Sequence, residues 1–518
     1  MTGRQRPVCS VTRSHAHMIL GTRWHVMFFA MALLSTATAC GVDDRDLSPA
    51  DAAREGNAGG SGPATDATHG DAAATVDTGA SSIETDARRP SGSILWARST
   101  SSLYLYGLAQ SSTGIVVTGT ISAPADLGGT LLVPVGSTDT VLAQFASSDA
   151  AHQSSARLGR TGDGGAGEVY GFIDVVDPAS TPLIHGLSYG NVDLGAGTVP
   201  GGGGTGADGF VGRYQLNGKP SWVKRLVGPG DDHFTSVTNG PNNTIFVSGW
   251  YDANTAFDVT HTFNAAGYRD IFFMQLDYGG AVVMEKTFAT SGFEQPNSIA
   301  WTGTHLMAAG FFNPTTAIGR FSLTAIDYGI WAGKFLPDGT PEWVVGFSGP
   351  GKDHNPSMTI DAAGDMYIAG TFTGSITFGS YDLTGAGSEV FAVKLRNADG
   401  SVAWATSLGS AGDDLGGDIA LNATGELILA ATVAGPLEPG GPFAGGTDVA
   451  LVSFDTSGAR RWAKVIGTGG TDSASAVSSG TDAFYASINL GGNIGMTVED
   501  QPIVGAPKPA GLVLKLQP

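Results

Sequence analysis

Short runs of alternating apolar and polar residues repeat along most of this chain, and they predict β-strands. The clearest copy begins with Trp404-Ala-Thr-Ser-Leu-Gly, continues through an apolar run at 424–431 and reaches Asp448-Val-Ala-Leu-Val-Ser-Phe. Turn signals such as Asn422-Ala-Thr-Gly separate these runs, as in antiparallel hairpins. The repeats contain no sustained apolar period of 3.6 residues, so we expect an all-β fold.

Three markers set the period of the repeat. The first is a Trp, with Ser155 and Met284 filling the two gaps in the series Trp96, Trp222, Trp343, Trp404 and Trp462. The second is an apolar strand that ends at a small residue: Gly119, Gly186, Gly249, Gly310, Gly370, Ala431 and Ser487. The third is an alternating strand that begins at Asp139, Asp208, Asp270, Gly329, Glu389, Asp448 and Ala510. Seven units of about 61 residues with four strands each predict a seven-bladed β-propeller over residues 93–518.

The two ends of the repeat region complement each other. The region starts with a lone Trp-bearing strand, residues 94–98, and finishes with residues 512–516, whose following Trp strand is missing. We expect the first strand to complete the last blade and close the ring, which removes two open sheet edges. An open solenoid, in which the terminal units would be capped, is the alternative.

The repeated phrase resembles that of bacterial SBBP-type β-propeller proteins, which are secreted or located on the cell surface. Trp-Ala-x-x-x-Gly, Gly-x-Asp, Gly-x-x-Tyr-x-x-Gly-x-Phe, best seen from Tyr367 to Phe372, and Asp-x-Phe-Val-x-Lys carry the resemblance. It covers about residues 94–518 and implies a fold and a location. It implies no activity, since the family has no shared catalytic residues.

The N-terminal part predicts export and anchoring. Residues 26–39 are apolar and follow basic residues, so residues 1–39 have the layout of a signal peptide. Ala37-Thr38-Ala39-Cys40 resembles the lipobox of bacterial lipoproteins, which implies lipidation of Cys40. The acidic Ala, Gly, Asp and Thr sequence up to residue 92 lacks large apolar residues, so residues 40–92 are expected to be a disordered tether. We therefore expect an envelope lipoprotein, on the outer membrane or cell surface, attached to the membrane through lipid.

Composition and charge narrow the partners. The chain has 78 Gly and 14% charged residues, which fits a β-rich fold with many turns, and its net charge of −20 argues against nucleic acid as a partner. The two cysteines, Cys9 and Cys40, precede the repeats, so no disulfide framework is available to the fold.

Acidic turns after the Trp strand carry the strongest candidate chemistry. Five aspartates recur there: Asp163, Asp232, Asp353, Asp414 and Asp472. They would form a ligand or cation ring near one mouth of the channel, with calcium as the candidate ion, although no loop has the spacing of a calcium loop. The favoured interpretation is that they cap turn amides, with no cofactor bound. His233 and His354 lie beside two of them and are expected on the surface.

No set of residues predicts catalysis. Gly186-Leu-Ser-Tyr-Gly190 matches the nucleophile motif of α/β-hydrolases, but that motif needs a strand, a turn and a helix around Ser188. The sequence therefore favours a noncatalytic surface propeller that binds a protein or glycan. Two alternatives remain: a hydrolase or lyase acting on carbohydrate at the channel, and a structural part of a surface assembly.

Overall fold

The computed structural model describes residues 89–135, 138–158, 168–177, 181–199, 206–258, 260–439, 441–480, 483–492, 497–498, 501–504 and 509–518. The predicted signal peptide, Cys40 and the tether up to residue 88 lie outside the described residues. The described part is built from strands, with one three-residue 3₁₀ turn, η2 (Pro241–Asn243). None of its helical elements is long and apolar enough to span a membrane.

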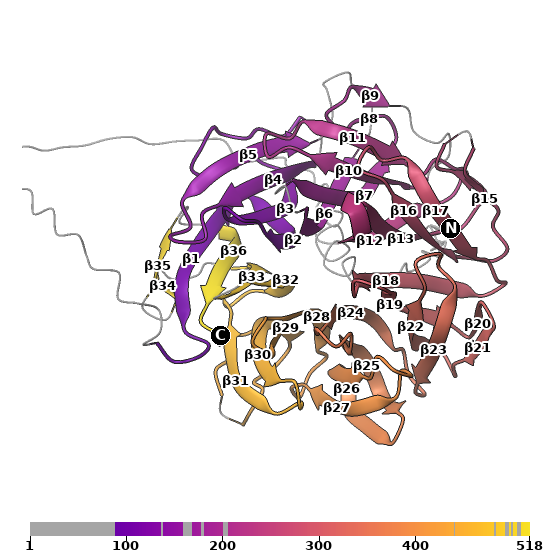
Figure 1. Ribbon diagram of the computed structural model, residues 1–518. Coiled ribbons are helices and arrows are strands. Elements are labelled where there is room, and N and C mark those ends of the chain that lie inside the picture. Colours follow the sequence, from indigo (N-terminus) through magenta and orange to yellow (C-terminus); the bar gives the residue numbers. More distant parts are fainter. Residues whose placement is uncertain are drawn as a thin grey trace, which may run out of the picture. The chain divides into compact units, whose positions relative to one another are not determined.

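Most strands fall into groups of four hydrogen-bonded antiparallel strands that follow one another along the chain (Figure 1), and each group is called a sheet below. The first two sheets consist of β2 (Leu103–Gln110), β3 (Ile115–Ile121), β4 (Asp139–Phe145) and β5 (His152–Leu158), then β6 (Glu168–Val176), β7 (Pro182–Tyr189), β10 (Asp208–Tyr214) and β11 (Pro220–Arg225). The next two consist of β12 (Asp232–Asn239), β13 (Ile245–Tyr251), β16 (Asp270–Leu276) and β17 (Val282–Phe288), then β18 (Phe293–Trp301), β19 (Leu306–Asn313), β22 (Gly329–Phe335) and β23 (Pro341–Ser348).

The later sheets have the same order. They consist of β24 (His354–Ile360), β25 (Met366–Phe378), β26 (Tyr381–Leu395) and β27 (Val402–Leu408), then β28 (Leu415–Leu421), β29 (Glu426–Val433), β30 (Asp448–Asp455) and β31 (Arg460–Ile466). One pair of residues, Ser348 of β23 and Thr377 of β25, joins the β24–β27 group to the group before it in an eight-stranded sheet. The last contains β32 (Ser473–Ser479), β33 (Phe484–Asn489), β36 (Pro509–Leu516) and β1 (Ile94–Ser101). Short hairpins extend from the sheets: β8 (Val192–Asp193) with β9 (Thr198–Val199), β14 (Thr255–Ala256) with β15 (Thr262–Phe263), and β20 (Thr315–Ile318) with β21 (Phe321–Thr324). A fourth hairpin, β34 (Thr497–Val498) with β35 (Gln501–Val504), extends the last sheet to six strands, because β35 runs parallel to β1.

Successive sheets pack face to face, and their apolar side chains form the core. Each hydrophobic cluster draws on two consecutive sheets; Leu183 and Val211 of one sheet, for example, meet Val247 and Phe272 of the next. Another cluster joins Leu105 of the first sheet to Val513 of the last. The first strands of the sheets contact one another in chain order, and β2 also contacts β32 (Figure 1).

The first and last strands of the region pair as the sequence predicts. β1 runs antiparallel to β36, with Trp96 opposite Lys515 and Arg98 opposite Val513. Gly92 N donates to Gln517 O at 2.8 Å, and Gln517 N donates to Ser93 O at 2.9 Å. The same two bonds close the covalent hairpin between β30 and β31, so the chain ends form a split turn.

The small-residue marker has a steric cause. A Cβ atom added at Gly249 would lie 2.0 Å from His233 O, and one at Gly310 would lie 2.0 Å from Gln295 O. At these glycines the second strand therefore passes too close to the first for a side chain, whereas the last two sheets have Ala431 and Ser487 at the same marker. The prediction that these strands end at the marker is wrong, because β13 and β19 continue to Tyr251 and Asn313.

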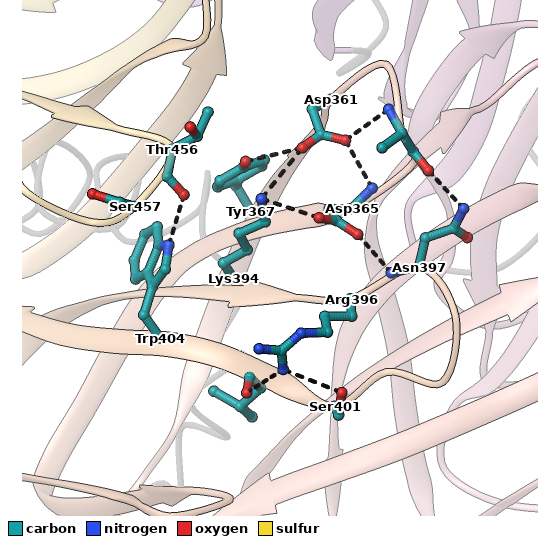
Figure 2. A network of polar contacts seen from close by, with 12 residues as sticks. Asp361, Asp365, Tyr367, Lys394, Arg396, Asn397, Ser401, Trp404, Thr456 and Ser457 are labelled. Carbon is teal, nitrogen blue, oxygen red and sulfur yellow. Dashed lines mark hydrogen bonds and ion pairs between the residues drawn. The ribbon is translucent and has the colours of Figure 1, made fainter.

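Trp side chains join the outermost strand of one sheet to a turn of the next. Trp404 Nε1 donates to Thr456 O at 3.0 Å, and a Cβ at Gly458 would lie 2.8 Å from the indole ring (Figure 2). Trp222 and Trp343 make the same bond to turns of their following sheets. The packing role predicted for Trp is thus confirmed. The prediction that Ser155 takes the place of this Trp in the first sheet is wrong. Ser154 stands opposite Gln144, as Trp404 stands opposite Lys394.

A polar network fixes the turn beside this Trp contact (Figure 2). Lys394 Nζ lies 3.0 Å from Asp365 Oδ2 and 3.4 Å from Asp361 Oδ2, and it stands 4.8 Å from the centre of the Tyr367 ring. Burial lowers the pKa of Lys394, but its hydrogen bonds to Tyr367 and Asp365 raise that pKa by more. The network stabilises the charged amine and holds the β24–β25 turn in place.

Candidate functional site

The first strands of the sheets surround a cavity of about 380 Å³. Residues from β2, β6, β12, β18, β24, β28 and β32 line it, so every sheet contributes to one space. Many of the lining side chains carry hydroxyl or amide groups, and two, Asp174 and Asp418, carry carboxylates. None of the described lining residues is Lys, Arg or His.

β-Bulges aim polar side chains into this cavity. Each of the first strands has a register shift against its neighbour, which leaves one or two residues without a partner in the ladder. Such residues turn away from the regular alternation of the strand. Residues in the bulges that line the cavity include Tyr106, Asp174, Asn297, Asp418 and Ser475.

Asp174 binds two sheets together at the cavity wall. Its Oδ2 accepts hydrogen bonds from Ser236 Oγ at 2.9 Å and Val237 N at 3.1 Å, both from the next sheet. His185 Nε2 lies 3.2 Å from the same oxygen, and His185 Nδ1 lies 3.1 Å from Phe234 O. His185 is 1% exposed, so this imidazole is a buried support and not part of the open surface.

Asp418 joins its own sheet to the sheets before and after it. Its Oδ1 accepts hydrogen bonds from Ser357 Oγ of the preceding sheet and from Ile419 N. Its Oδ2 accepts one from Val477 N of the following sheet at 3.1 Å. Asp418 therefore links three consecutive sheets, and these donors occupy much of its capacity as an acceptor.

The rings of Tyr104 and Tyr106 form the part of the wall on β2, and Phe172 of β6 packs against Tyr106. The rings of Tyr104 and Tyr106 lie 5.4 Å apart, and Phe172 lies 5.3 Å from Tyr106. Burial raises the pKa of Tyr104 to about 12, while hydrogen bonds to Ser473 and Asn489 lower it. The Tyr104 hydroxyl is therefore a neutral donor at physiological pH.

The described aspartates of the predicted acidic ring do not line this cavity. Asp232, Asp353, Asp414 and Asp472 are each 0% exposed and do not line the cavity, and Asp163 lies outside the described residues. Their oxygens accept loop hydrogen bonds, as from Gly349 N to Asp353 at 2.9 Å and from Gly491 N to Asp472 at 2.7 Å. These contacts are the turn-capping contacts that the sequence favours. Cation binding by these aspartates stays a prediction.

Two of these aspartates are strongly perturbed. Burial raises the pKa of Asp353 to about 8, against the opposing effect of hydrogen bonds from Gly349 and Thr373. Burial also raises the pKa of Asp232 to about 8, with the charge of Asp252 adding to the rise. Both carboxyl groups therefore hold a proton more tightly than an exposed aspartate does.

The remaining candidates from the sequence are structural. His233 is 6% exposed and stacks on Trp250 at 4.1 Å, so its predicted surface position is wrong; burial lowers its pKa. The side chain of His354 lies outside the described part. Ser188 is 0% exposed within β7, and its Oγ donates to Asp208 O at 3.2 Å. β7 is followed by β8 and not by a helix, so Ser188 lacks the setting of a nucleophile.

The sequence markers did not single out Asp174, Asp418 or the other residues at the bulges. A signal was present, since both aspartates interrupt runs that otherwise predict buried strands, as in Ile173-Asp174-Val175. To identify these residues from the sequence, the first strands of all the units must be aligned with one another. The bulges shift that alignment from one unit to the next.

No family model matches the chain, and no curated protein matches it. A solved structure of quinohemoprotein alcohol dehydrogenase from Comamonas testosteroni is similar at 13% identity, with 83% of this chain and 77% of that chain covered and a TM-score of 0.41. An ulvan lyase is similar at 11% identity, with 77% and 93% covered and a TM-score of 0.42. An apocarotenoid oxygenase mutant from Synechocystis is similar at 11% identity, with 83% and 94% covered and a TM-score of 0.37.

Proposed function

We propose that residues 93–518 form a seven-bladed β-propeller closed by β1, and that it is a noncatalytic binding protein whose ligand enters the central cavity. Two observations support the closed ring: β1 pairs with β36, and β2 contacts β32. The observation that carries the function is the set of bulges that brings polar side chains from all the first strands to one cavity. Bulges at such positions commonly re-aim side chains toward a binding site.

A neutral glycan is the ligand class that fits this lining. Hydroxyl and amide side chains such as Thr238, Ser298 and Asn297 both donate and accept hydrogen bonds, as sugar hydroxyl groups do. The rings of Tyr104 and Tyr106 add apolar faces beside them. The described lining has no Lys, Arg or His to attract an anion, and a cavity of about 380 Å³ suits a short saccharide.

The engagement of the two carboxylates favours binding over catalysis. A general acid or base must exchange a proton with the substrate, so it needs an oxygen within reach of that substrate. Asp418 accepts from Ser357, Ile419 and Val477, and Asp174 accepts from Ser236 and Val237. Their main task in this interpretation is to hold adjacent sheets together around the ligand.

Binding can be tested by calorimetry with a panel of neutral oligosaccharides. Thr238→Trp would fill the cavity, and we expect it to abolish binding with little change in melting temperature, because Thr238 is only partly buried. Thr324→Trp, at an exposed position on β21, is the control and should bind as the parent does. Equal binding by the Thr238→Trp variant would contradict a central site.

The location is part of the proposal. Lipidation of Cys40 would anchor the protein in the cell envelope, on the outer membrane or the cell surface, with residues 41–92 as the tether. Metabolic labelling with a fatty acid should label the parent and not Cys40→Ser. An unlabelled parent protein would remove the anchor from this model.

A hydrolase or lyase acting on carbohydrate is the second candidate. The observation in its favour is that two carboxylates, Asp174 and Asp418, line one cavity, since many glycosidases use a carboxylate pair. Incubation with polysaccharides and detection of new reducing ends or unsaturated products would decide it. Product formation by the parent protein that Asp174→Asn abolishes would replace the binding model with this one.

A further inference from the structure

Carboxylates meet in pairs where one sheet passes to the next. One member begins the third strand of a sheet, and the other lies where the chain enters the following sheet. Burial is the main cause of the raised pKa of one member of each pair, and the charge of the other member adds to the rise. The described pairs are Asp208 with Asp232, Asp270 with Glu294, Glu389 with Asp414, and Asp448 with Asp472. Two separate markers of the repeat therefore come together in space.

An arginine supplies the counter-charge in the first two sheets. Arg225 Nη2 lies 2.8 Å from Asp208 Oδ2, and Arg225 stands on the fourth strand opposite Phe210. Arg157 Nη1 lies 2.7 Å from Asp139 Oδ2 and has the equivalent place in the first sheet. One fixed position on the fourth strand thus delivers a positive charge to the carboxylate that begins the third strand.

Three other junctions lack this arginine. Arg225 stands opposite the residue that lies two positions after Asp208. The residues in the same place relative to Asp270, Glu389 and Asp448 are Thr287, Ser407 and Val465. Within the described part of the chain, no Lys, Arg or His forms an ion pair with any of the six carboxylates of these junctions.

Carboxylate oxygens gather beside the Gly that ends the Trp phrase. From the point where a Cβ of Gly409 would stand, Glu389 Oε2 is 1.3 Å away and Asp414 Oδ2 is 3.0 Å away. At the equivalent Gly467, Asp448 Oδ1 is 2.0 Å from that point. Gly409 and Gly467 therefore leave the space that these carboxylates occupy, whereas the equivalent position at the junction of Asp270 with Glu294 is Ala289.

Two of the oxygens are buried without a donor. Asp448 Oδ1 and Glu294 Oε2 accept no hydrogen bond from any described residue, and both residues are 1% exposed. Burying like charges without a counter-charge is costly, so something must neutralise them. In the first two sheets a guanidinium supplies positive charge beside the carboxylate that begins the third strand, although Asp232 Oδ1 at the second of these junctions also accepts no hydrogen bond from a described residue.

We propose that each of the three arginine-free junctions binds a divalent cation, Ca²⁺, between its two carboxylates. The donors are hard oxygens, which Ca²⁺ prefers, and a hydroxyl group adjoins one carboxylate of each junction: Thr290 beside Glu294, Ser410 beside Asp414 and Thr468 beside Asp472. The cations stand between sheets and not around the channel mouth. They stabilise the packing of consecutive sheets and take no part in glycan binding at the central cavity.

Ca²⁺ titration of the chelator-stripped full chain tests this proposal. We expect three bound ions per molecule and a higher melting temperature, since a ligand of the folded state stabilises it. Ser407→Arg places a guanidinium where Arg225 stands in the second sheet, so it should reduce the stoichiometry from three to two. Val465→Arg should do the same, and the double variant should retain one ion. Ser322→Arg, at an exposed position on β21, is the matched control and should keep all three.

Several results would overturn the proposal. Absence of Ca²⁺ binding would do so, as would an unchanged stoichiometry in both Ser407→Arg and Val465→Arg. If the chelator-stripped protein binds no Ca²⁺ but loses stability as the pH rises, then protons shared between the paired carboxylates, and not cations, neutralise their charge. If Ser407→Arg fails to fold, Glu389→Gln tests the same site and should also remove one ion. Glycan binding is measured separately, so its failure leaves this test intact.

Discussion

The backbone amide of Gly92 donates a 2.8 Å hydrogen bond to the carbonyl oxygen of Gln517, more than four hundred residues along the chain. Gly458 N makes the same bond to Asp455 O, at 2.9 Å, within a continuous hairpin. Gly92 and Gly458 both have positive φ angles, 81° and 88°, and each stands against the indole of a Trp from the preceding sheet. The contact between the two ends of the repeat region is therefore a turn of the repeat with a break in it.

Removing β1 should destabilise the whole repeat region. Ile94 is 1% exposed and Trp96 is 7% exposed, so deleting residues 94–99 exposes their partners and opens the edge of β36. Burial of two large apolar side chains accounts for about 4 kcal/mol of unfolding free energy. We expect a clear fall in melting temperature by calorimetry. Deletion of residues 41–88, which removes no described residue, is the control, and an equal melting temperature for both deletions would count against closure.

A circular permutant should fold without any added linker. In the continuous hairpin, two residues, Thr456 and Ser457, separate the residues that match Gln517 and Gly92. Pro518 and Ser91 would fill these two places if they were joined directly. A chain that joins them and starts at Ser457 should melt at or above the temperature of the parent, because the closing turn is now covalent. A permutant that joins the same ends but starts inside β30 should not fold; similar melting of the two would argue against this view of the turn.

The contribution of the Trp404 contact to stability can be divided into that of ring packing and that of the hydrogen bond. Trp404→Phe removes the bond to Thr456 O and keeps most of the ring, so we expect a loss of about 1 kcal/mol in urea unfolding. Trp404→Ala should cost about 3 kcal/mol. Trp301→Phe is the control, since the Trp301 ring stacks on Phe246 and its N–H donates to no described residue. If both Phe variants lose the same amount, the hydrogen bond contributes nothing.

The sequence was informative about the fold because the repeat multiplies each signal. Trp404 and its equivalents mark an inter-sheet contact, and Gly249 and Gly310 mark a strand crossing that tolerates no Cβ. These constraints depend on local backbone geometry, which most copies of the unit share, although the last two copies have Ala431 and Ser487 at the position of Gly249 and Gly310. The pairing of β1 with β36 followed from the missing partners at the two ends.

The candidate site was harder to predict because it depends on departures from the repeat. Asp174 and Asp418 reach the cavity through bulges, and the bulge in β6 lies further along its strand than that in β12. An alternating pattern assigns such residues to a face that the bulge then changes. Likewise, the meeting of Glu389 with Asp414 joins two markers that are far apart within the unit, and only the packing of two sheets reveals it.

Buried Asp353 should make stability depend on pH in a direction that exposed aspartates do not. Burial raises its pKa to about 8 in the folded protein, whereas an unfolded aspartate has a pKa of about 4. Between these values the folded state holds a proton that the unfolded state has lost. This contribution to the free energy of unfolding is therefore complete below about pH 4, and it is lost as the pH rises through about 8.

Asp353→Asn should remove this dependence, because the amide stays neutral and its oxygen can still accept the bond from Gly349 N. The parent should lose up to about 1.4 kcal/mol per pH unit at this site, so the variant should gain on the parent between pH 5 and pH 8.5 in urea unfolding. Asp399→Asn is the control: hydrogen bonds to Ser401 lower the pKa of Asp399, so it stays ionised throughout this range. Parallel pH profiles for the parent and Asp353→Asn would mean that Asp353 is ionised in the folded protein and that its buried charge is compensated by another group.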